Sequence, residues 1–259
     1  MNLEQLENVT VYILESLRPG DKKTGENLRD ALRQYWLDEK GKCFFCEYHV
    51  VPNKSSLLKQ LQYIENQVEK ENKIPILQLE CHGCKQGIQL SSNEIINWSE
   101  LFNSIRPINI VSHNLLYLNL SMCNGDAVIS YIDPEHRASF RAVTGPLGEV
   151  YPDKLEELWV SFYKEYSSAI QLDCGFSKLA QRVGLIYYNQ DFIFDVYYDL
   201  ANKDPELFVH LRNREMAAMY KNEGPLAMNP EIYRKFAAKK QAEIKEKYKS
   251  HFCFEELDT

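Results

Sequence analysis

A histidine and a cysteine each follow directly on an apolar run of the sequence. His82 comes after the run 74–81, and Cys123 comes after the run 115–122. A cysteine attacks an amide carbonyl as its thiolate, and a nearby imidazole can take the thiol proton. Two buried strands that end at these residues on one edge of a parallel sheet would bring the thiol and the imidazole together. The spacing therefore predicts a nucleophile and a general base for acyl transfer.

Glycines stand next to both residues. Gly83 directly follows the histidine, and Gly125 closely follows the cysteine. Glycine lets the backbone turn sharply and approach a substrate closely. A tetrahedral intermediate needs preorganised N–H donors around its oxyanion. We expect the backbone N–H groups of Gly83 and Cys123 to form this oxyanion hole.

The elements that must position these residues alternate along the chain as far as about residue 170. Strands are expected at 9–15, 42–51, 75–81, 115–122 and 140–144, with helices at 24–37, 55–67, 98–105, 126–132 and 153–166. Thr24 is placed to cap the first of these helices. Alternating strands and helices are typical of an α/β fold with a mostly parallel sheet. In such a sheet, ligands bind at the carboxyl ends of the strands, where His82 and Cys123 fall.

The pattern changes after residue 170. Helices are expected at 179–185, 206–221 and 230–248, while the aromatic run at 191–199 fits no single element. We therefore divide the chain into an α/β domain over residues 1–170 and a mainly helical C-terminal extension over residues 171–259.

Three stretches of the sequence resemble the bacterial caspase-like peptidases, including the CHAT group related to caspases and separase. They are Leu-Glu-Cys-His-Gly-Cys-Lys-Gln-Gly-Ile-Gln-Leu at 79–90, Ile-Asn-Trp-Ser-Glu-Leu at 96–101 and Leu-Asn-Leu-Ser-Met-Cys-Asn-Gly at 118–125. The resemblance covers about residues 5–170. It implies a caspase-like, mostly parallel sheet flanked by helices, a catalytic dyad of His82 and Cys123, and a thiol protease that uses no cofactor and no metal. Members of this group often act in bacterial antiviral defence or programmed death.

The sequence departs from the family around the nucleophile. The caspase pattern Gln-Ala-Cys-x-Gly is absent, and Ser121 stands where metacaspase-like enzymes usually carry an acidic residue. The residue specificity of the family is therefore not transferred to this chain. Asp126 is near the predicted site and is a candidate to bind a basic substrate side chain, although an aspartate at a helix start is the simpler interpretation.

Composition limits the other classes of function. The chain has 259 residues, 44% of them hydrophobic, so it can bury a sizeable core. No apolar run approaches the ~20 residues of a membrane helix, and the N-terminus lacks the pattern of a secretory signal. The net charge of −7 argues against direct nucleic-acid binding. We expect a cytoplasmic protein that meets a protein substrate and is restrained by a regulatory partner or by self-association.

Two alternatives remain open at the level of sequence. The pairs Cys43/Cys46 and Cys81/Cys84, with His49 nearby, have the CxxC spacing of zinc ligands. The first pair begins a strand and the second ends one, so in a parallel sheet the two pairs would lie at opposite edges. The other alternative is a catalytically silent interaction module on the caspase-like fold, which would dock a partner with its C-terminal helices.

Overall fold

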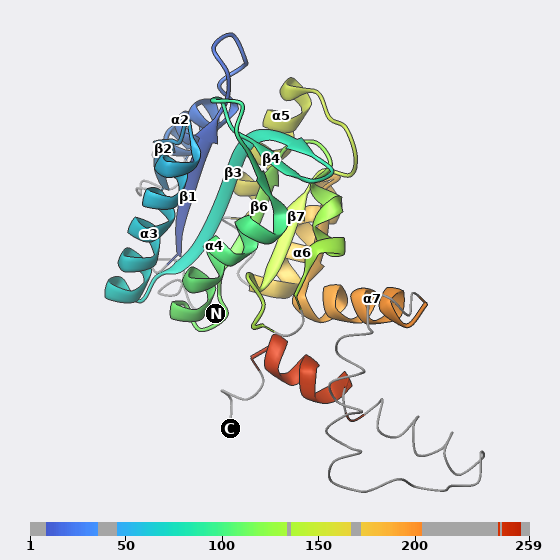
Figure 1. Ribbon diagram of the computed structural model, residues 1–259. Coiled ribbons are helices and arrows are strands. Elements are labelled where there is room, and N and C mark those ends of the chain that lie inside the picture. Colours follow the sequence, from blue (N-terminus) through green and yellow to red (C-terminus); the bar gives the residue numbers. More distant parts are fainter. Residues whose placement is uncertain are drawn as a thin grey trace, which may run out of the picture.

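A mostly parallel β-sheet forms the centre of the protein (Figure 1). In this computed structural model, residues 9–35, 46–133, 136–166, 172–203, 243 and 245–254 are described. The strand order across the sheet is β2 (Cys46–Val50), β1 (Val9–Ser16), β3 (Ile74–Cys84), β6 (Tyr117–Ser121), β7 (Ala142–Gly145) and β8 (Ile186–Asn189). Neighbouring strands are parallel except for β8, which pairs antiparallel with β7. The predicted α/β class with a mostly parallel sheet is confirmed.

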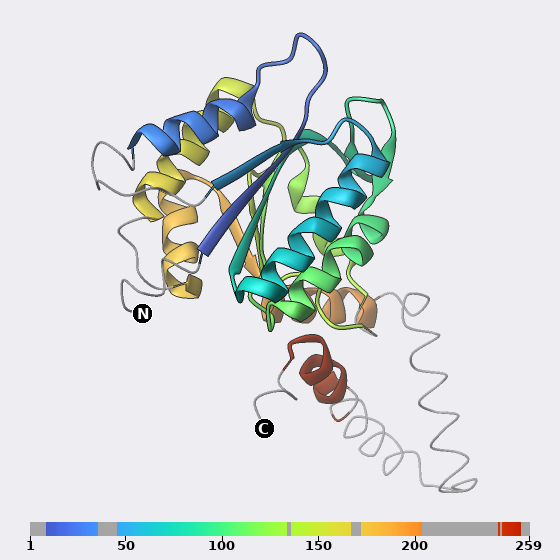
Figure 2. The ribbon, with the colours of Figure 1, turned by 90° about the vertical axis from the view of Figure 1, so that its left-hand side faces the viewer.

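Helices cover both faces of the sheet (Figure 2). One face is covered by α3 (Lys54–Glu71) and α4 (Trp98–Val111), and the other by α2 (Thr24–Tyr35), α5 (Pro152–Tyr166) and α6 (Leu172–Val183). Each helix presents an apolar stripe to the sheet, as its sequence spacing indicates. The arrangement gives two hydrophobic cores, one on each side of the strands.

Strand β1 contributes side chains to both hydrophobic cores. All eight of its residues are buried. Successive side chains of a strand point to opposite faces. Tyr12 and Leu14 accordingly pack with the α3 and α4 core, whereas Val11 and Ile13 pack with the α2 and α5 core. A strand buried on both faces has a nearly continuous apolar sequence, which is the pattern seen here.

A small hairpin extends the sheet beyond the parallel strands. β3 continues past its predicted end at residue 81, so His82 and Gly83 are part of the strand. Its last residues pair antiparallel with β4 (Gly87–Gln89), which pairs in turn with β5 (Ile95–Asn97). The Trp98 indole N–H donates to the Lys85 carbonyl oxygen at 3.0 Å and anchors the hairpin to the start of α4. Neither β4 nor β5 was predicted from the sequence.

The segment after residue 170 is part of the same sheet and cores. β8 is the outermost strand, and α7 (Gln190–Lys203) follows it. A C-terminal helix over residues 245–252 packs below α7, where Phe252 and Phe254 join the α3 and α4 core. The division at residue 170 therefore does not separate two cores. The helices expected at 206–221 and over most of 230–248 lie outside the described residues.

Two further predictions concern membrane-spanning helices and the helix expected at 126–132. No helix within the described ranges is long and apolar enough to cross a bilayer. The helix expected at 126–132 is a short 3-10 helix, η2 (Gly125–Tyr131).

Candidate active site

His82 lies near the end of β3, and Cys123 lies in the turn that follows the neighbouring strand β6, at the same edge of the sheet. β3 pairs with β6 in parallel, and the last paired residues are Glu80 and Ser121. His82 and Cys123 each lie two residues beyond this pair. Because side chains alternate along a strand, His82 continues the face of β3 on which Glu80 lies, whereas Cys123 is in the turn after β6. The two residues thus lie at one edge of the sheet, and their pairing as a dyad stays a prediction.

The backbone at Gly83 packs directly against the backbone at Cys123. A Cβ atom added at Gly83 would overlap the carbonyl oxygen of Cys123 and press on Met122 Cγ. The overlap is with backbone, so it is not relieved by moving a flexible side chain. A side chain at position 83 would push the two strand ends apart. Glycine is therefore required here for the close approach of the histidine and cysteine segments.

The two candidate catalytic side chains have separate hydrogen-bond partners. His82 Nε2 lies 2.8 Å from Asp21 Oδ2, and the Cys123 thiol donates to the Val150 carbonyl oxygen at 3.8 Å. Among the described residues, no hydrogen bond joins His82 to Cys123. Both side chains are partly exposed, so the imidazole and the thiol are accessible to a reactant.

Asp21 is a site residue that the sequence analysis missed. It lies in the turn after β1, and its carboxylate accepts hydrogen bonds from His82 and from the Arg18 backbone N–H. The hydrogen bond with His82 lowers the pKa of Asp21 below its ordinary value. The signal that could have found it is positional, because β1 also ends at the edge where His82 and Cys123 lie.

Two rows of polar side chains lie beneath His82 and Cys123, where the surrounding positions of the sheet are apolar. Gln78 pairs in register with Asn119, one step below Glu80 and Ser121. The Tyr163 hydroxyl from α5 donates to Gln78 Oε1 at 2.9 Å and accepts from Asn119 Nδ2 at 2.8 Å. Gln78 Nε2 in turn donates to Glu80 Oε1 at 2.8 Å. A hydrogen-bonded polar column thus supports the strand ends from within the core.

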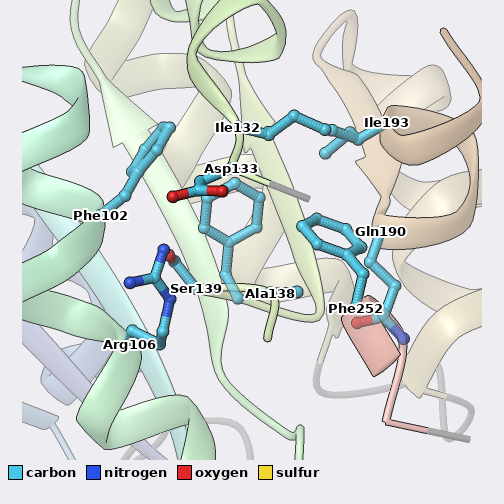
Figure 3. Close-up of a pocket in the computed structure, with 10 residues that line it drawn as sticks. Phe102, Arg106, Ile132, Asp133, Ala138, Ser139, Gln190, Ile193 and Phe252 are labelled. Atoms are coloured by element: carbon cyan, nitrogen blue, oxygen red, sulfur yellow. The ribbon is translucent and has the colours of Figure 1, made fainter. Parts of the chain in front are cut away.

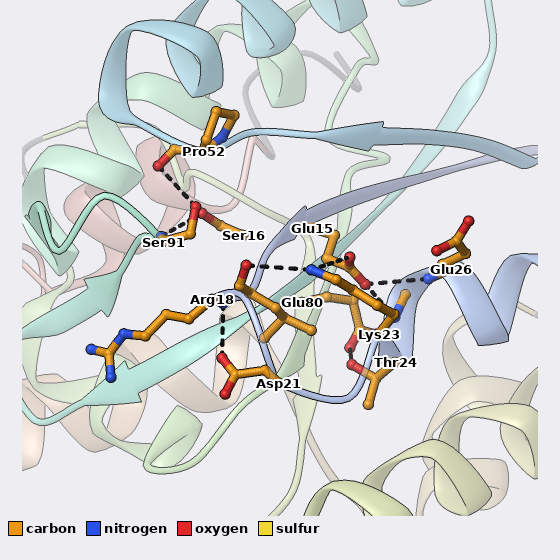
Figure 4. A network of polar contacts seen from close by, with 12 residues as sticks. Glu15, Ser16, Arg18, Asp21, Lys23, Thr24, Glu26, Pro52, Glu80 and Ser91 are labelled. Atoms are coloured by element: carbon orange, nitrogen blue, oxygen red, sulfur yellow. Dashed lines mark hydrogen bonds and ion pairs between the residues drawn. The ribbon is translucent and has the colours of Figure 1, made fainter.

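Two buried carboxylates complete this column (Figure 4). Glu80 accepts a hydrogen bond from the Thr24 hydroxyl at 2.7 Å, and Glu15 accepts from the backbone N–H groups of Gly25 and Glu26 at 2.9 and 3.3 Å. Glu15 therefore caps α2, in place of the expected cap by Thr24. A carboxylate at a helix N-terminus is favoured by the helix dipole.

Glu80 is more costly to ionise than an ordinary glutamate. Burial raises its pKa to about 7, while the hydrogen bonds from Thr24 and Gln78 act in the opposite direction. Glu15 adds a like charge nearby, which also raises the pKa of Glu80. Near neutral pH, Glu80 thus changes its charge directly below the strand ends that carry His82 and Cys123.

The turn after β6 holds one of the two predicted oxyanion donors, the backbone N–H of Cys123. Asn124 has a left-handed backbone with φ of 57°, and its N–H donates to the Gly148 carbonyl oxygen at 3.1 Å. In the described part of the chain, no group accepts a hydrogen bond from the Cys123 N–H. The Cys123 N–H stays a predicted donor to an oxyanion. Gly83 is paired in register with Ile88 of β4, and its N–H stays a predicted donor.

The remaining predicted ligands are placed as follows. Asp126 is in the η2 helix, directly after Gly125, but its side chain lies outside the described part. Cys43 also lies outside the described residues. Within them, no group of three or more potential metal ligands is found.

The zinc alternative can be examined for Cys46 and Cys81. Cys46 pairs in register with Val11 of β1, and Cys81 pairs with Ser16. The two thiols are thus separated by β1 and by five residues along it, which is about 16 Å at ~3.3 Å per residue. A zinc ion with ligands at ~2.3 Å does not bridge that distance.

A small pocket lies away from this site (Figure 3). It is lined mainly by apolar side chains, with Arg106, Asp133, Ser139 and Gln190 as polar members. Its lining includes residues 138–140, which directly precede β7, and Phe252 of the C-terminal helix. It is therefore at the opposite strand ends from Cys123 and contributes nothing to the candidate dyad.

No known family model matches the chain, and no curated protein gives a significant match. The function is therefore argued from the geometry of the site and from the resemblance of its motifs.

Proposed function

We propose that the protein is a caspase-like cysteine peptidase that cleaves a protein substrate with a dyad of His82 and Cys123. The observation that supports this proposal most is the packing of the Gly83 backbone on the Cys123 backbone at the ends of β3 and β6. That contact brings the histidine segment and a partly exposed thiol to one edge of the sheet. A buried structural cysteine would not need such access.

The chemistry follows from these groups. The Cys123 thiolate attacks the peptide carbonyl carbon and forms a carbon–sulfur bond, while His82 holds the proton that left the thiol. His82 then gives this proton to the amine as the carbon–nitrogen bond breaks. Water hydrolyses the thioester, which releases the acid and restores the thiol. The Cys123 N–H would be one donor to the oxyanion.

The loop after β7 is the proposed wall of the substrate site. Its Val150 carbonyl oxygen contacts the thiol, and its Gly148 carbonyl oxygen accepts from the residue after Cys123. Leu147 and Tyr151 of the same loop are 66% and 85% exposed. Exposed apolar side chains next to a nucleophile favour a polypeptide substrate with apolar groups. Binding of the substrate or of a regulatory partner would turn the thiol toward His82.

The proposal is tested by alkylation of Cys123 with iodoacetamide, followed by peptide mass mapping. We expect Cys123 to react faster than Cys84, which is also partly exposed. The variant His82→Ala should slow the alkylation of Cys123 but not that of Cys84. Burial raises the pKa of Cys46 to about 12 and also raises that of Cys81, so these thiols are poor competitors. His49→Ala is the matched control, since His49 lies on β2.

A second measurement separates a peptidase from a silent interaction module. The full chain is incubated with a proteome-derived peptide library, and new termini are identified by mass spectrometry. We expect cleavage that disappears in Cys123→Ala and His82→Ala and persists in Cys84→Ser. If alkylation of Cys123 is independent of His82 and no new termini appear, the protein is a silent module on this fold and the peptidase proposal fails.

A further inference from the structure

The turn between β1 and α2 holds a carboxylate against the candidate catalytic histidine. Asp21 Oδ2 lies 2.8 Å from His82 Nε2, which is the distance of a charge-assisted hydrogen bond. The residues are 61 positions apart in the sequence, so only the fold brings them together. Nothing in the chemistry described above uses this contact.

Asp21 is held in place by its own turn. The Arg18 backbone N–H donates to Asp21 Oδ2 at 2.8 Å, and the Asp21 N–H donates to the Arg18 carbonyl oxygen at 3.1 Å. The Arg18 guanidinium then donates to Gln89 Oε1 of β4 at 2.6 Å. β4 pairs with the end of β3, where His82 itself pairs with Gln89. The carboxylate and the imidazole are therefore fixed to the same hairpin.

The turn has a second anchor on the opposite side. Lys22 forms ion pairs with Asp153 and Glu156 of α5, at 2.6 and 3.0 Å. The loop that carries Asp21 is thus attached both to the β4 hairpin and to α5. A carboxylate that is held from two sides can orient a ring, because few of its own rotations remain.

The contact between His82 and Asp21 is too exposed to contribute mainly to folding stability. The side chains of His82 and Asp21 are 44% and 33% exposed. Ion pairs with this degree of exposure contribute little to folding, because water screens them. The contact does determine which imidazole nitrogen carries the proton. A carboxylate accepts only from an N–H, so the bond to Asp21 places a hydrogen on Nε2 and leaves the lone pair of neutral His82 on Nδ1.

We propose that Asp21 is a positioning residue that fixes the Nε2–H form of His82 and directs Nδ1 toward the thiol of Cys123. It also stabilises the imidazolium that forms when the thiol proton is taken. This inference rests on the proposed peptidase function, because it assigns a role within that same site. It extends the candidate dyad to a triad of Asp21, His82 and Cys123, with the carboxylate supplied by the β1 turn.

The first test is kinetic and uses Asp21→Asn, Asp21→Ala and Asp21→Glu in the full chain. Loss of the aspartate from a buried serine-peptidase triad lowers kcat about 10⁴-fold. Because this pair is partly solvated, we expect a smaller loss, about 10- to 100-fold in kcat for Asn and Ala. KM should stay nearly unchanged, and Glu should restore part of kcat.

The second test does not depend on turnover. The rate of iodoacetamide reaction at Cys123 is measured from pH 5 to pH 9. Without the Asp21 carboxylate, the imidazolium–thiolate pair loses a stabilising charge, so the rise of this rate should move to higher pH in Asp21→Asn. Long-range ¹H–¹⁵N NMR of the imidazole should show Nε2–H in the wild type and a mixture of both tautomers in the variant.

Asp30→Asn is the matched control. Asp30 also pairs with a cation, Arg29, which lowers its pKa, but it lies on the exposed side of α2 and does not touch His82. This variant should leave the tautomer and the rate profile unchanged. A common shift in both variants would indicate a general charge effect and overturn the positioning role.

The outcomes separate this inference from the proposed function. One outcome is that Asp21→Asn leaves the His82 tautomer and the pH profile of Cys123 alkylation unchanged, while the alkylation rate of Cys123 still depends on His82. In that case the positioning role is wrong and the dyad stands. If Asp21→Asn lowers activity only on substrates with a basic residue at the cleaved bond, and does so by raising KM, then Asp21 binds substrate. The positioning role is wrong in that case too. If the alkylation rate of Cys123 does not depend on His82 at all, the peptidase proposal itself fails, and the positioning role fails with it.

Discussion

Replacing the buried Glu80 by glutamine should make the protein more stable at alkaline pH. Glu80 is on β3, which pairs with β1 on one side and β6 on the other. Its carboxyl group accepts hydrogen bonds from Thr24, at the start of α2, and from Gln78. Glutamine has nearly the same shape but never ionises. The change therefore removes one buried charge and keeps the packing of the core.

The size of the effect follows from the pKa of Glu80, which burial raises from 4.5 to about 7. Each unit corresponds to ~1.4 kcal/mol, so ionisation costs about 3 kcal/mol more in the folded protein than in the unfolded chain. The folded protein binds this proton more tightly than the unfolded chain. The free energy of unfolding should therefore fall as pH rises from 4.5 to 7, with the full loss present above pH 7.

The assay is urea unfolding followed by circular dichroism at pH 4.5 and pH 8. The quantity to compare is the stability difference between variant and wild type at the two pH values. We expect this difference to increase by about 3 kcal/mol in favour of Glu80→Gln on going to pH 8. Any cost of the amide that does not depend on pH, such as an imperfect hydrogen bond, cancels in this comparison.

An exposed glutamate gives the matched control. Glu69 is exposed on α3, so Glu69→Gln should change stability by the same small amount at both pH values. If the pH-dependent difference for Glu80→Gln stays below about 1 kcal/mol, the reasoning from burial to ionisation cost is refuted.

Two further substitutions probe the strand ends and the column beneath them. Gly83→Ala should cost about 1–3 kcal/mol in urea unfolding and slow the alkylation of Cys123, because the added Cβ meets backbone; unchanged reactivity would refute the close approach. Tyr163→Phe removes a hydroxyl that two buried amides share, so we expect a loss of about 1–3 kcal/mol with an unchanged urea slope. A loss below about 0.5 kcal/mol would show that the amides find other partners.

The sequence predicted the parallel part of the sheet well. The expected strands at 9–15, 75–81 and 115–122 overlap β1, β3 and β6, and the helices between them are present. Apolar periodicity is a local property, and long buried elements repeat it many times. β4, β5 and β8 were missed because each has only three or four residues. Such short strands form by pairing with neighbours and carry little pattern of their own.

The candidate site was predicted in part. His82, Gly83 and Cys123 were found because each directly follows an apolar run, and the rule for parallel sheets places such residues at one edge. Asp21 was missed because a turn aspartate has a simple local explanation. Its contact with His82 depends on the path of the turn across the end of β3, which no local pattern encodes.

The sequence alone determined which segments become strands and helices and which of them end in reactive side chains. Local spacing of apolar residues is sufficient for this, because burial of one face or both faces fixes the period. The tertiary structure alone decided the registers between strands, and the registers set the chemistry. They stack Gln78 and Glu80 under His82, place the Gly83 backbone on Cys123, and bring Asp21 to the imidazole. These contacts join residues far apart in the chain, so their energies exist only once the sheet has formed.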